Sequence, residues 1–322
     1  MTILCAVLAA AMFGAGHYMS GTVSRRVGPA TVAYWTQFGV VAVAAVLLLA
    51  RPLPEQWSIP ALAWGTVAAI GGVAGSLFLY KALSKATFTL AVGASTVTTT
   101  VTPAIVALLF LGEQITVLRI VLILLAVLTV WLLVSQRRSK GVAVVTSPLP
   151  VITSQMPVVS AEDDADSPAP EPVEHTGPSS PGAGLLALGA GLGYATELVG
   201  VAQIPQEDFA QGLLAWAVVS FLVMLVMILL RRGPQAPRLL PQGGAGALVI
   251  LAGGFSAFGM LLFHISAAGV GLATTSAIVA VYPAVPILLA VLILRERPSP
   301  RGWAGLACAG LVVALGAYGT SL

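Results

Sequence analysis

Ten long apolar stretches, separated by short polar breaks, fill almost the whole chain of 322 residues. A helix needs about 20 apolar residues to cross the hydrocarbon core of a bilayer. Within lipid every backbone amide must be paired inside the segment, so such stretches form helices, and the alternating pattern of a membrane barrel is absent. Only 8% of the residues are charged, against about 25% in soluble domains. The sequence therefore predicts an all-α integral membrane protein with spans near 3–22, 30–50, 60–80, 88–111, 116–135, 184–203, 209–230, 243–266, 270–294 and 301–320.

Residues 136–183 interrupt this pattern. They begin with basic residues, continue with a Val/Pro/Ser-rich stretch and contain an acidic run between Glu162 and Glu174. Such a composition cannot bury enough apolar surface to order itself. We expect a first domain at 1–135, a disordered acidic and Pro-rich linker at 136–183, and a second domain at 184–322.

The two domains repeat each other. When residue n is placed beside residue n+183, the fourth span falls on the ninth without a gap, and Pro103 and Glu113 meet Pro286 and Glu296. Each domain holds five spans, and an odd number inverts the second copy relative to the first. Inverted repeats are the architecture of many secondary transporters, whose substrate site lies near the bilayer midplane between the halves.

Lys and Arg residues indicate the orientation, because cytoplasmic loops carry an excess of them. The loops after spans 1, 3, 5, 7 and 9 hold 13 of these residues, and the opposite side holds only Arg51 and Arg119. This bias predicts a multi-pass protein of the cell membrane with the linker in the cytoplasm and both termini outside. The basic residues sit at helix ends and form no patch, so nucleic acid is not an expected partner.

The end of the fourth span, Pro103 to Thr116 with its Gly112-Glu113 pair, resembles the EamA-type repeat of the drug/metabolite transporter superfamily. Residues 294–299 are similar to its second copy, and Tyr80-Lys81-Ala82-Leu83 resembles the family's Tyr and Ala-Leu at the end of the third helix. The resemblance implies a ten-helix transporter that moves small metabolites or drugs, often outward. It also implies cytoplasmic termini, opposite to the charge bias. The chain departs from the family pattern at Gln37, where an Arg is common, at Arg295, where a Gly precedes the Glu, and in its longer linker.

Titratable side chains inside the spans are candidates for proton coupling, because polar groups are costly in the membrane and are retained for a reason. Glu197 is the only acid well inside a predicted span, and desolvation favours the neutral form of a carboxyl group. His17 and His264 could relay protons. The alternatives are a carboxylate held by a neighbouring hydroxyl and histidines bonded to backbone carbonyls.

Further polar and aromatic side chains inside the spans are candidates for substrate binding. Four hydroxyls at i, i+3, i+4 and i+7 share one face of the fourth span, although Ser and Thr also join helices by bonding backbone carbonyls. The indole rings of the second and seventh spans lie deeper than an interfacial belt. Prolines can kink their helices and free carbonyls toward a cavity, or give only a packing bend. The substrate candidates are Trp35, Gln37, Tyr80, Ser95, Thr98, Thr99, Thr102, Trp216, Thr275 and Tyr282, and the kink candidates are Pro103, Pro283 and Pro286.

Two further patterns indicate structure rather than chemistry. Gly71-Gly72-x-x-Gly75 and the glycines at 189, 191 and 193 favour close helix contact. Glu113 and Glu296 lie at helix ends beside arginines and are interpreted as structural partners of those arginines.

The leading hypothesis is a secondary transporter working by alternating access, with a small-molecule solute, the bilayer and candidate coupling protons as its partners, as a monomer or homodimer. A flippase for an amphiphilic molecule and a non-transporting scaffold are the alternatives. No phosphate-binding loop G-x-x-x-x-G-K-[ST] occurs, and Cys5 and Cys308 lie inside spans without a metal or disulfide framework. We therefore expect no enzyme activity, no metal and no cofactor.

Overall fold

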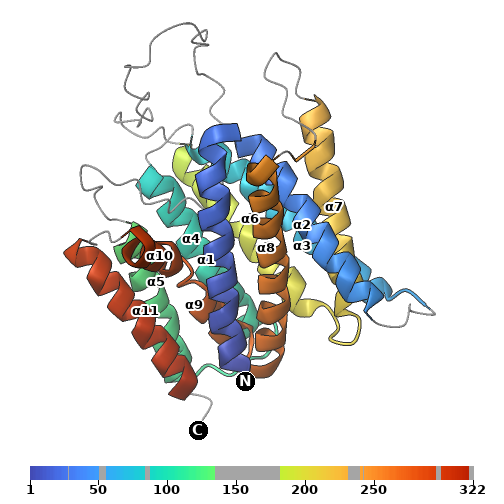
Figure 1. The fold of residues 1–322 in the computed structure, drawn as a ribbon. Coiled ribbons are helices and arrows are strands. Elements are labelled where there is room, and N and C mark those ends of the chain that lie inside the picture. Colours follow the sequence, from blue (N-terminus) through green and yellow to red (C-terminus); the bar gives the residue numbers. More distant parts are fainter. Residues whose placement is uncertain are drawn as a thin grey trace, which may run out of the picture.

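The computed structural model of the chain describes residues 1–27, 29–50, 56–83, 88–134, 182–230, 240–241, 243–294 and 299–318. These residues form helices joined by turns, with no strand among them (Figure 1). The predicted linker and the residues around Glu296 lie outside the described residues. The helices are α1 (Thr2–Val27), α2 (Pro29–Leu49), α3 (Ile59–Leu83), α4 (Phe88–Leu109), α5 (Val117–Val134), α6 (Ala183–Gln203), α7 (Phe209–Leu230), α8 (Gly243–Val270), α9 (Leu272–Val279), α10 (Ala284–Leu294) and α11 (Pro300–Tyr318).

Eight of the described helices are long and apolar enough to cross a membrane, namely α1, α2, α3, α5, α6, α7, α8 and α11. The apolar part of α4 is shorter, at Gly93–Leu109. This agrees with an all-α membrane protein. The ninth stretch, expected as one span over 270–294, is instead divided between α9 and α10.

The division of the ninth stretch has a local cause. Residues 280–283 form a turn in which the backbone bonds run from residue i to i−3, as in Tyr282 N–H to Val279 O at 2.9 Å and Val285 N–H to Tyr282 O at 3.0 Å. Pro283 has no N–H to donate, and it disfavours the helical conformation of the residue before it. The α10 ribbon is consequently seen nearly end-on in Figure 1, where α1 and α8 are seen from the side.

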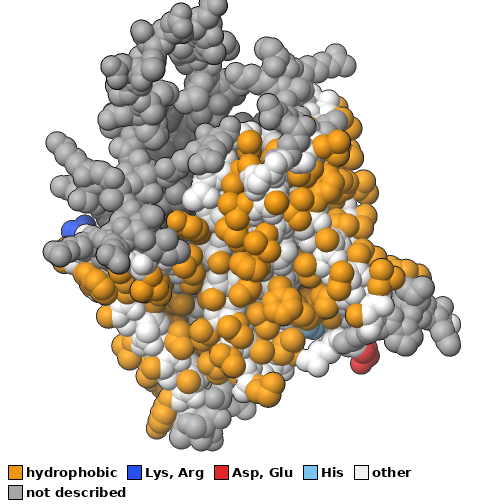
Figure 2. Space-filling view, in the orientation of Figure 1, with side chains coloured by type: hydrophobic (Ala, Val, Ile, Leu, Met, Phe, Trp, Pro, Cys, Tyr) orange, Lys and Arg blue, Asp and Glu red, His pale blue; other side chains and the backbone are white. Residues whose placement is uncertain are grey.

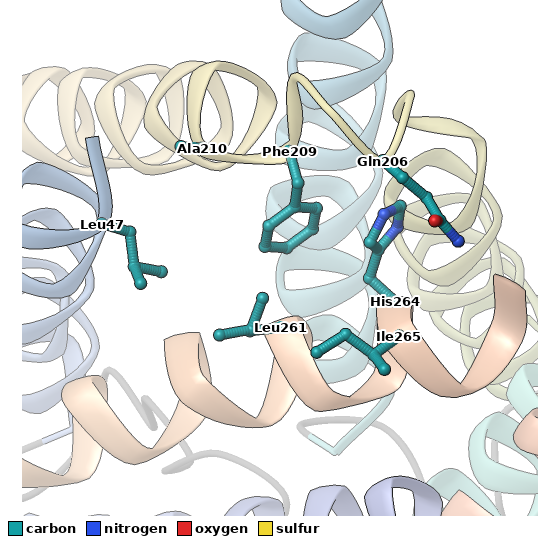
Figure 3. A pocket seen from close by; sticks show the side chains of 7 residues that line it. All are labelled: Leu47, Gln206, Phe209, Ala210, Leu261, His264 and Ile265. Carbon is teal, nitrogen blue, oxygen red and sulfur yellow. The ribbon is translucent and has the colours of Figure 1, made fainter. Parts of the chain in front are cut away.

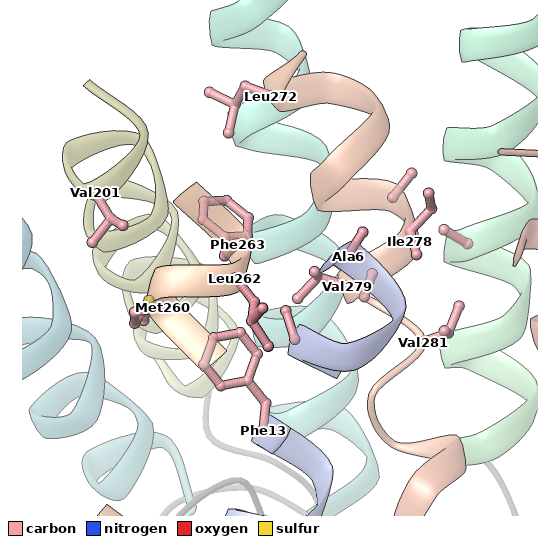
Figure 4. Close-up of a cluster of buried hydrophobic side chains, with 14 of the residues drawn as sticks. Ala6, Phe13, Val201, Met260, Leu262, Phe263, Leu272, Ile278, Val279 and Val281 are labelled. Atoms are coloured by element: carbon pink, nitrogen blue, oxygen red, sulfur yellow. The ribbon is translucent and has the colours of Figure 1, made fainter. Parts of the chain in front are cut away.

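Helices from the first part of the chain, α1 to α5, pack against helices from the second part, α6 to α11. The most extensive contacts join α3 with α6 and α1 with α8, and α2 packs on both α7 and α8. The short helix α9 lies in the middle and contacts α4, α5 and α8, and every side chain from Leu272 to Val279 is buried. The core is therefore shared by the first and second parts of the chain, as the buried cluster of Phe13, Val201, Phe263 and Ile278 also shows (Figure 4).

Glycines allow the closest of these contacts. A Cβ atom on Gly193 of α6 would overlap the backbone of Gly75 in α3, and one on Gly39 of α2 would overlap the carbonyl of Ile250 in α8. Lipid chains are as apolar as leucine, so helices in a bilayer associate mainly through close packing, which small residues permit. The expectation that the glycines of these two motifs bring helices together is confirmed.

The outer surface is apolar. Figure 2 shows a face covered by hydrophobic side chains, with charged side chains only near its margins. Leu109, Leu185 and Leu292 are 67%, 73% and 74% exposed, which would leave a large apolar patch in water. Such a surface fits the hydrocarbon of a bilayer.

Candidate functional site

A group of polar side chains meets at the break between α9 and α10. The ring of His17, from the middle of α1, lies 5.2 Å from the ring of Tyr282 between centroids. The Tyr282 side chain also hydrogen-bonds that of Thr96 from α4. This group, called the break cluster below, joins the first half of the chain to the interrupted helix of the second half. Broken helices in membrane proteins occur where backbone is buried in protein or lines a cavity.

A second polar contact lies between α3, α6 and α7. The Trp216 indole donates a hydrogen bond to Oε1 of Glu197 at 3.0 Å, and Trp216 is only 6% exposed. Gly72 of α3 faces the carboxylate, because a Cβ atom there would lie 2.6 Å from the same oxygen. Sequence reasoning selected Glu197 and Trp216 separately, and the structure brings them together.

His264 of α8 contacts the last turn of α6 and the first turn of α7. It is 3% exposed, its Nδ1 is 2.9 Å from the carbonyl oxygen of Val201, and its ring stacks on Phe209 with centroids 4.3 Å apart. No partner for its Nε2 occurs among the described residues. The imidazole lies in the wall of a cavity of about 190 Å³ (Figure 3), which is lined by Leu47, Gln206, Phe209, Ala210, Leu261, His264 and Ile265.

Two of the four hydroxyls of the fourth span, those of Thr98 and Thr99, bond their own helix, and that of Thr99 also reaches α6. Thr98 donates to the carbonyl of Ala94 at 2.8 Å, and Thr99 to that of Ser95 at 2.9 Å with a longer contact to Gly191 O at 3.4 Å. Ser95 is buried and Thr102 is half-buried. In this conformation Thr98 and Thr99 therefore serve helix packing, and the substrate role of the four stays a prediction.

The remaining substrate candidates are dispersed. Trp35 is 1% exposed within an apolar cluster that includes Val32 and Val249. Thr275 is fully buried, with its hydroxyl 2.9 Å from that of Ser266. Gln37 donates to Ala33 O at 3.3 Å, while no partner for its buried Oε1 is found in the described part of the chain.

The three prolines predicted to kink helices and the substrate candidate Tyr80 lie in different parts of the fold. Pro103 is buried inside α4, which continues through it. Pro283 ends the turn before α10, and Pro286 lies in the first turn of α10. Tyr80 belongs to the last turn of α3, and its side chain lies outside the described residues.

Glu113 has a role that sequence reasoning found only in part. Its expected ion pair with Arg119 is present at 3.5 Å. Its Oε1 also accepts the backbone N–H of Leu272, the first residue of α9. The preceding Gly271 has φ +92°, and a Cβ atom on it would lie 2.6 Å from the Glu113 carboxylate. The bond from Leu272 N–H to Glu113 caps the start of α9. The only sequence signal for this cap was a glycine before a polar run.

Comparison with known proteins finds a family match for the second part of the chain. A model of the EamA-like transporter family matches residues 182–318, the part that contains α6 to α11. No curated protein matches the chain. One matching solved structure, described only as a crystal structure of a protein, has 18% identity and a TM-score of 0.64, covering 97% of this chain and 93% of that one; at this identity it supports the fold alone. Residues 182–318 thus match the EamA-like transporter family, which supports a membrane transporter of the EamA type in the drug/metabolite transporter superfamily.

Proposed function

We propose that the protein is a secondary transporter that moves a small metabolite or drug, in the outward direction, by alternating access of two inverted five-helix repeats. The first repeat is α1 to α5, and the second is α6 to α11, with α9 and α10 counted as one interrupted span. The break cluster of His17, Thr96 and Tyr282 carries the proposal. It joins both repeats at a broken helix in mid-bundle, where secondary transporters bind substrate.

Reciprocal helix contacts support the repeat. If each helix corresponds to the one five spans later, the pair α1 with α8 corresponds to α6 with α3, and α2 with α8 corresponds to α7 with α3; all four pairs are in contact. The pairs α2 with α7 and α5 with α11 join a helix to its own counterpart. In Figure 1 α6 ends near the end of the bundle where α1 begins, as expected of inverted copies.

Proton coupling through Glu197 is the second part of the proposal. The carboxylate lies six residues before the end of α6, about 9 Å along the helix at 1.5 Å per residue. An ionised group at such depth is costly, so exchange of a proton there could be linked to solute movement. The indole of Trp216 supplies a fixed donor to the carboxylate.

Flux in proteoliposomes tests the substrate site. Tyr282→Phe removes the hydroxyl that Thr96 contacts and keeps the ring beside His17, whereas Tyr318→Phe makes the same change in the exposed last turn of α11. We expect Tyr282→Phe to reduce counterflow of a metabolite panel about ten-fold or more and Tyr318→Phe to leave it unchanged. Equal flux in both variants would contradict the break cluster as the site.

Two other functions remain as outcomes of such tests. A flippase would require lipid-like density between the repeats, and a scaffold would depend on the linker. Deletion of residues 141–180 distinguishes the scaffold, because a transporter keeps its flux without that segment and a scaffold loses its partner.

A further inference from the structure

The start of α9 is held by a side chain from the other half of the chain. Glu113, in the loop between α4 and α5, accepts the backbone N–H of Leu272 with its Oε1. The loop lies at the end of the bundle that carries both chain termini (Figure 1), where a Cβ atom on Gly269 of α8 would overlap Thr2. This end is called the terminal face below. The bond from Leu272 to Glu113 therefore joins the two proposed repeats at one face of the molecule.

The sequence of α9 provides no cap of its own. The first N–H groups of a helix need acceptors, and the residue before the helix commonly supplies one from a Ser, Thr, Asp or Asn side chain. In α9 that residue is Gly271, with φ +92° and no side-chain hydrogen bond. A Cβ atom on it would lie 2.6 Å from an oxygen of Glu113. The glycine thus leaves room for an acceptor that comes from outside the helix.

The first repeat holds the Glu113 carboxylate by contacts of its own. Gly112 has φ +70°, and the N–H of Glu113 donates to Ala107 O of α4 at 3.0 Å. Oε2 of Glu113 accepts no hydrogen bond from the described residues, and it pairs with Arg119 at 3.5 Å. These contacts lie within the first repeat. A movement of the loop away from α9 would therefore leave them in place and break only the hydrogen bond to Leu272.

The two parts of the interrupted span contact the first repeat differently. The helix α9, between the terminal face and the break cluster, packs against α4 and α5, whereas α10 packs on α1 and α11. Within the described residues α10 makes no comparable contact with α4 or α5, and Figure 1 shows it running across the direction of the long helices. Contact on one side of a shared site and separation on the other is the arrangement of a rocking transporter that is closed to one compartment.

We propose that Glu113 is a latch that keeps the terminal face closed: its bond to Leu272 holds α9 against the α4–α5 loop in this conformation and breaks when that face opens. This inference rests on the proposed alternating access, and it adds which face is closed and which contact closes it. Loss of an N-cap acceptor shifts an equilibrium by about two- to thirty-fold. The minor conformation of a two-state protein is populated at about 0.1–10%, so a single bond of this kind shifts the balance measurably.

Distances across the terminal face test the latch in the full chain, held in nanodiscs, with Cys5 and Cys308 replaced by alanine. Spin labels are attached after Gln114→Cys in the α4–α5 loop and Ala268→Cys near the end of α8, because both positions are exposed. Electron paramagnetic resonance gives the fractions of molecules with a short and a long distance. We expect Glu113→Ala to raise the ratio of long to short by about two- to thirty-fold, and Glu113→Gln, which keeps an acceptor, to raise it less. An unchanged ratio in Glu113→Ala would overturn the proposal.

Gln211→Ala is the matched control, because it removes a bond of the same kind between the repeats. Oε1 of Gln211, near the start of α7, accepts the N–H of Ser58, just before α3, at 2.7 Å. The helices α3 and α7 also pack closely, since a Cβ atom on Gly65 would overlap the carbonyl of Gly212, so the loss of one bond should not separate them. We expect the ratio of distances to stay unchanged in Gln211→Ala. A rise as large as that of Glu113→Ala would indicate general loosening and would overturn the assignment of the latch to Glu113.

A reversible cross-link separates failure of the latch from failure of transport. A short bis-methanethiosulfonate linker between the cysteines of Gln114→Cys and Ala268→Cys ties the α4–α5 loop to α8, and a reductant removes it. We expect the cross-link to nearly abolish solute counterflow in proteoliposomes and the reductant to restore it. Equal counterflow with and without the cross-link would overturn the opening of this face and leave transport itself intact. An absence of counterflow in the reduced protein would instead contradict the proposed transport, and the spin-label distances would still decide whether Glu113 holds the face closed.

Discussion

Glu197 has an environment that a glutamine could share. Its Oε1 accepts from the Trp216 indole at 3.0 Å, and the amide oxygen of a glutamine can accept the same bond. The two side chains also have nearly the same shape. A substitution at this position therefore separates the capacity to exchange a proton from the packing of α3, α6 and α7.

We predict that Glu197→Gln abolishes solute uptake driven by a pH gradient but leaves solute exchange and the unfolding midpoint close to those of the wild type. The carboxyl group that could carry the proton is gone, while the hydrogen bond that holds α6 to α7 is kept. Glu207→Gln, in the exposed α6–α7 loop, is the matched control and should retain gradient-driven uptake. Normal gradient-driven uptake by Glu197→Gln would remove this residue from the coupling mechanism.

The sequence indicated unusual residues such as Glu197 one at a time. It did not indicate which residue each of them would hydrogen-bond. Glu197 and Trp216 were selected as a buried acid and a deep indole, because a single position in a span reveals an unusual residue type. Their hydrogen bond joins two helices, and the cap from Glu113 to Leu272 joins residues 159 positions apart. Such pairs depend on helix rotation and crossing, which the mean hydropathy of a span does not encode.

A helix could be predicted from the sequence where the length of its apolar stretch determines it. A break within a helix could not, because it depends on local backbone geometry. The apolar stretches indicated the long helices, because crossing a bilayer requires a length of about 20 residues. The ninth stretch met that length requirement and still divides into α9 and α10. Pro283 and Pro286 are kink candidates from the sequence, but a proline within a helix can also be accommodated, as Pro103 is in α4.

The start of α9 depends on Glu113, so we predict that Glu113→Ala lowers the stability of the protein by about 0.5–2 kcal/mol, the range for loss of an N-cap acceptor. Glu113→Gln keeps an acceptor for the Leu272 N–H and should lose less. Denaturant titration in detergent, followed by far-UV circular dichroism, measures both.

Arg119→Gln is the control for the Glu113 cap, because it removes the ion pair and leaves the cap. The Arg119 and Glu113 side chains are 22% and 15% exposed, and pairs near the surface contribute at most about 1 kcal/mol. If Arg119→Gln destabilised the protein as much as Glu113→Ala, the ion pair rather than the cap would hold the start of α9.

The crossing of α3 and α6 gives a second prediction for the elements. Gly193→Ala should lower the midpoint of thermal unfolding, because the new Cβ meets the backbone of Gly75, and overpacking costs about 1–3 kcal/mol. Gly310→Ala in α11 meets no atom within 4 Å, so it should leave the midpoint unchanged or raise it slightly. Equal midpoints would show that α3 and α6 can separate at no cost.

The proposed inverted repeat predicts on which side of the membrane each loop lies. If the repeats are inverted, the loop between α2 and α3 and its counterpart between α7 and α8 must lie on opposite sides of the membrane. Gln56 and Leu240 are exposed positions in these two loops. The bias of 13 basic residues against 2 further predicts that the α7–α8 loop is cytoplasmic, because positive charge is retained on that side.

Single cysteines at positions 56 and 240, in a chain with Cys5 and Cys308 replaced by alanine, test both statements. We predict that an impermeant maleimide labels position 56 in intact cells and labels position 240 only after permeabilisation. The reverse pattern would keep the inverted repeats and place both termini in the cytoplasm, as the family resemblance implies. Labelling of both positions from the same side would mean parallel copies, and two parallel copies could not present the break cluster to each compartment in turn by rocking about a shared site.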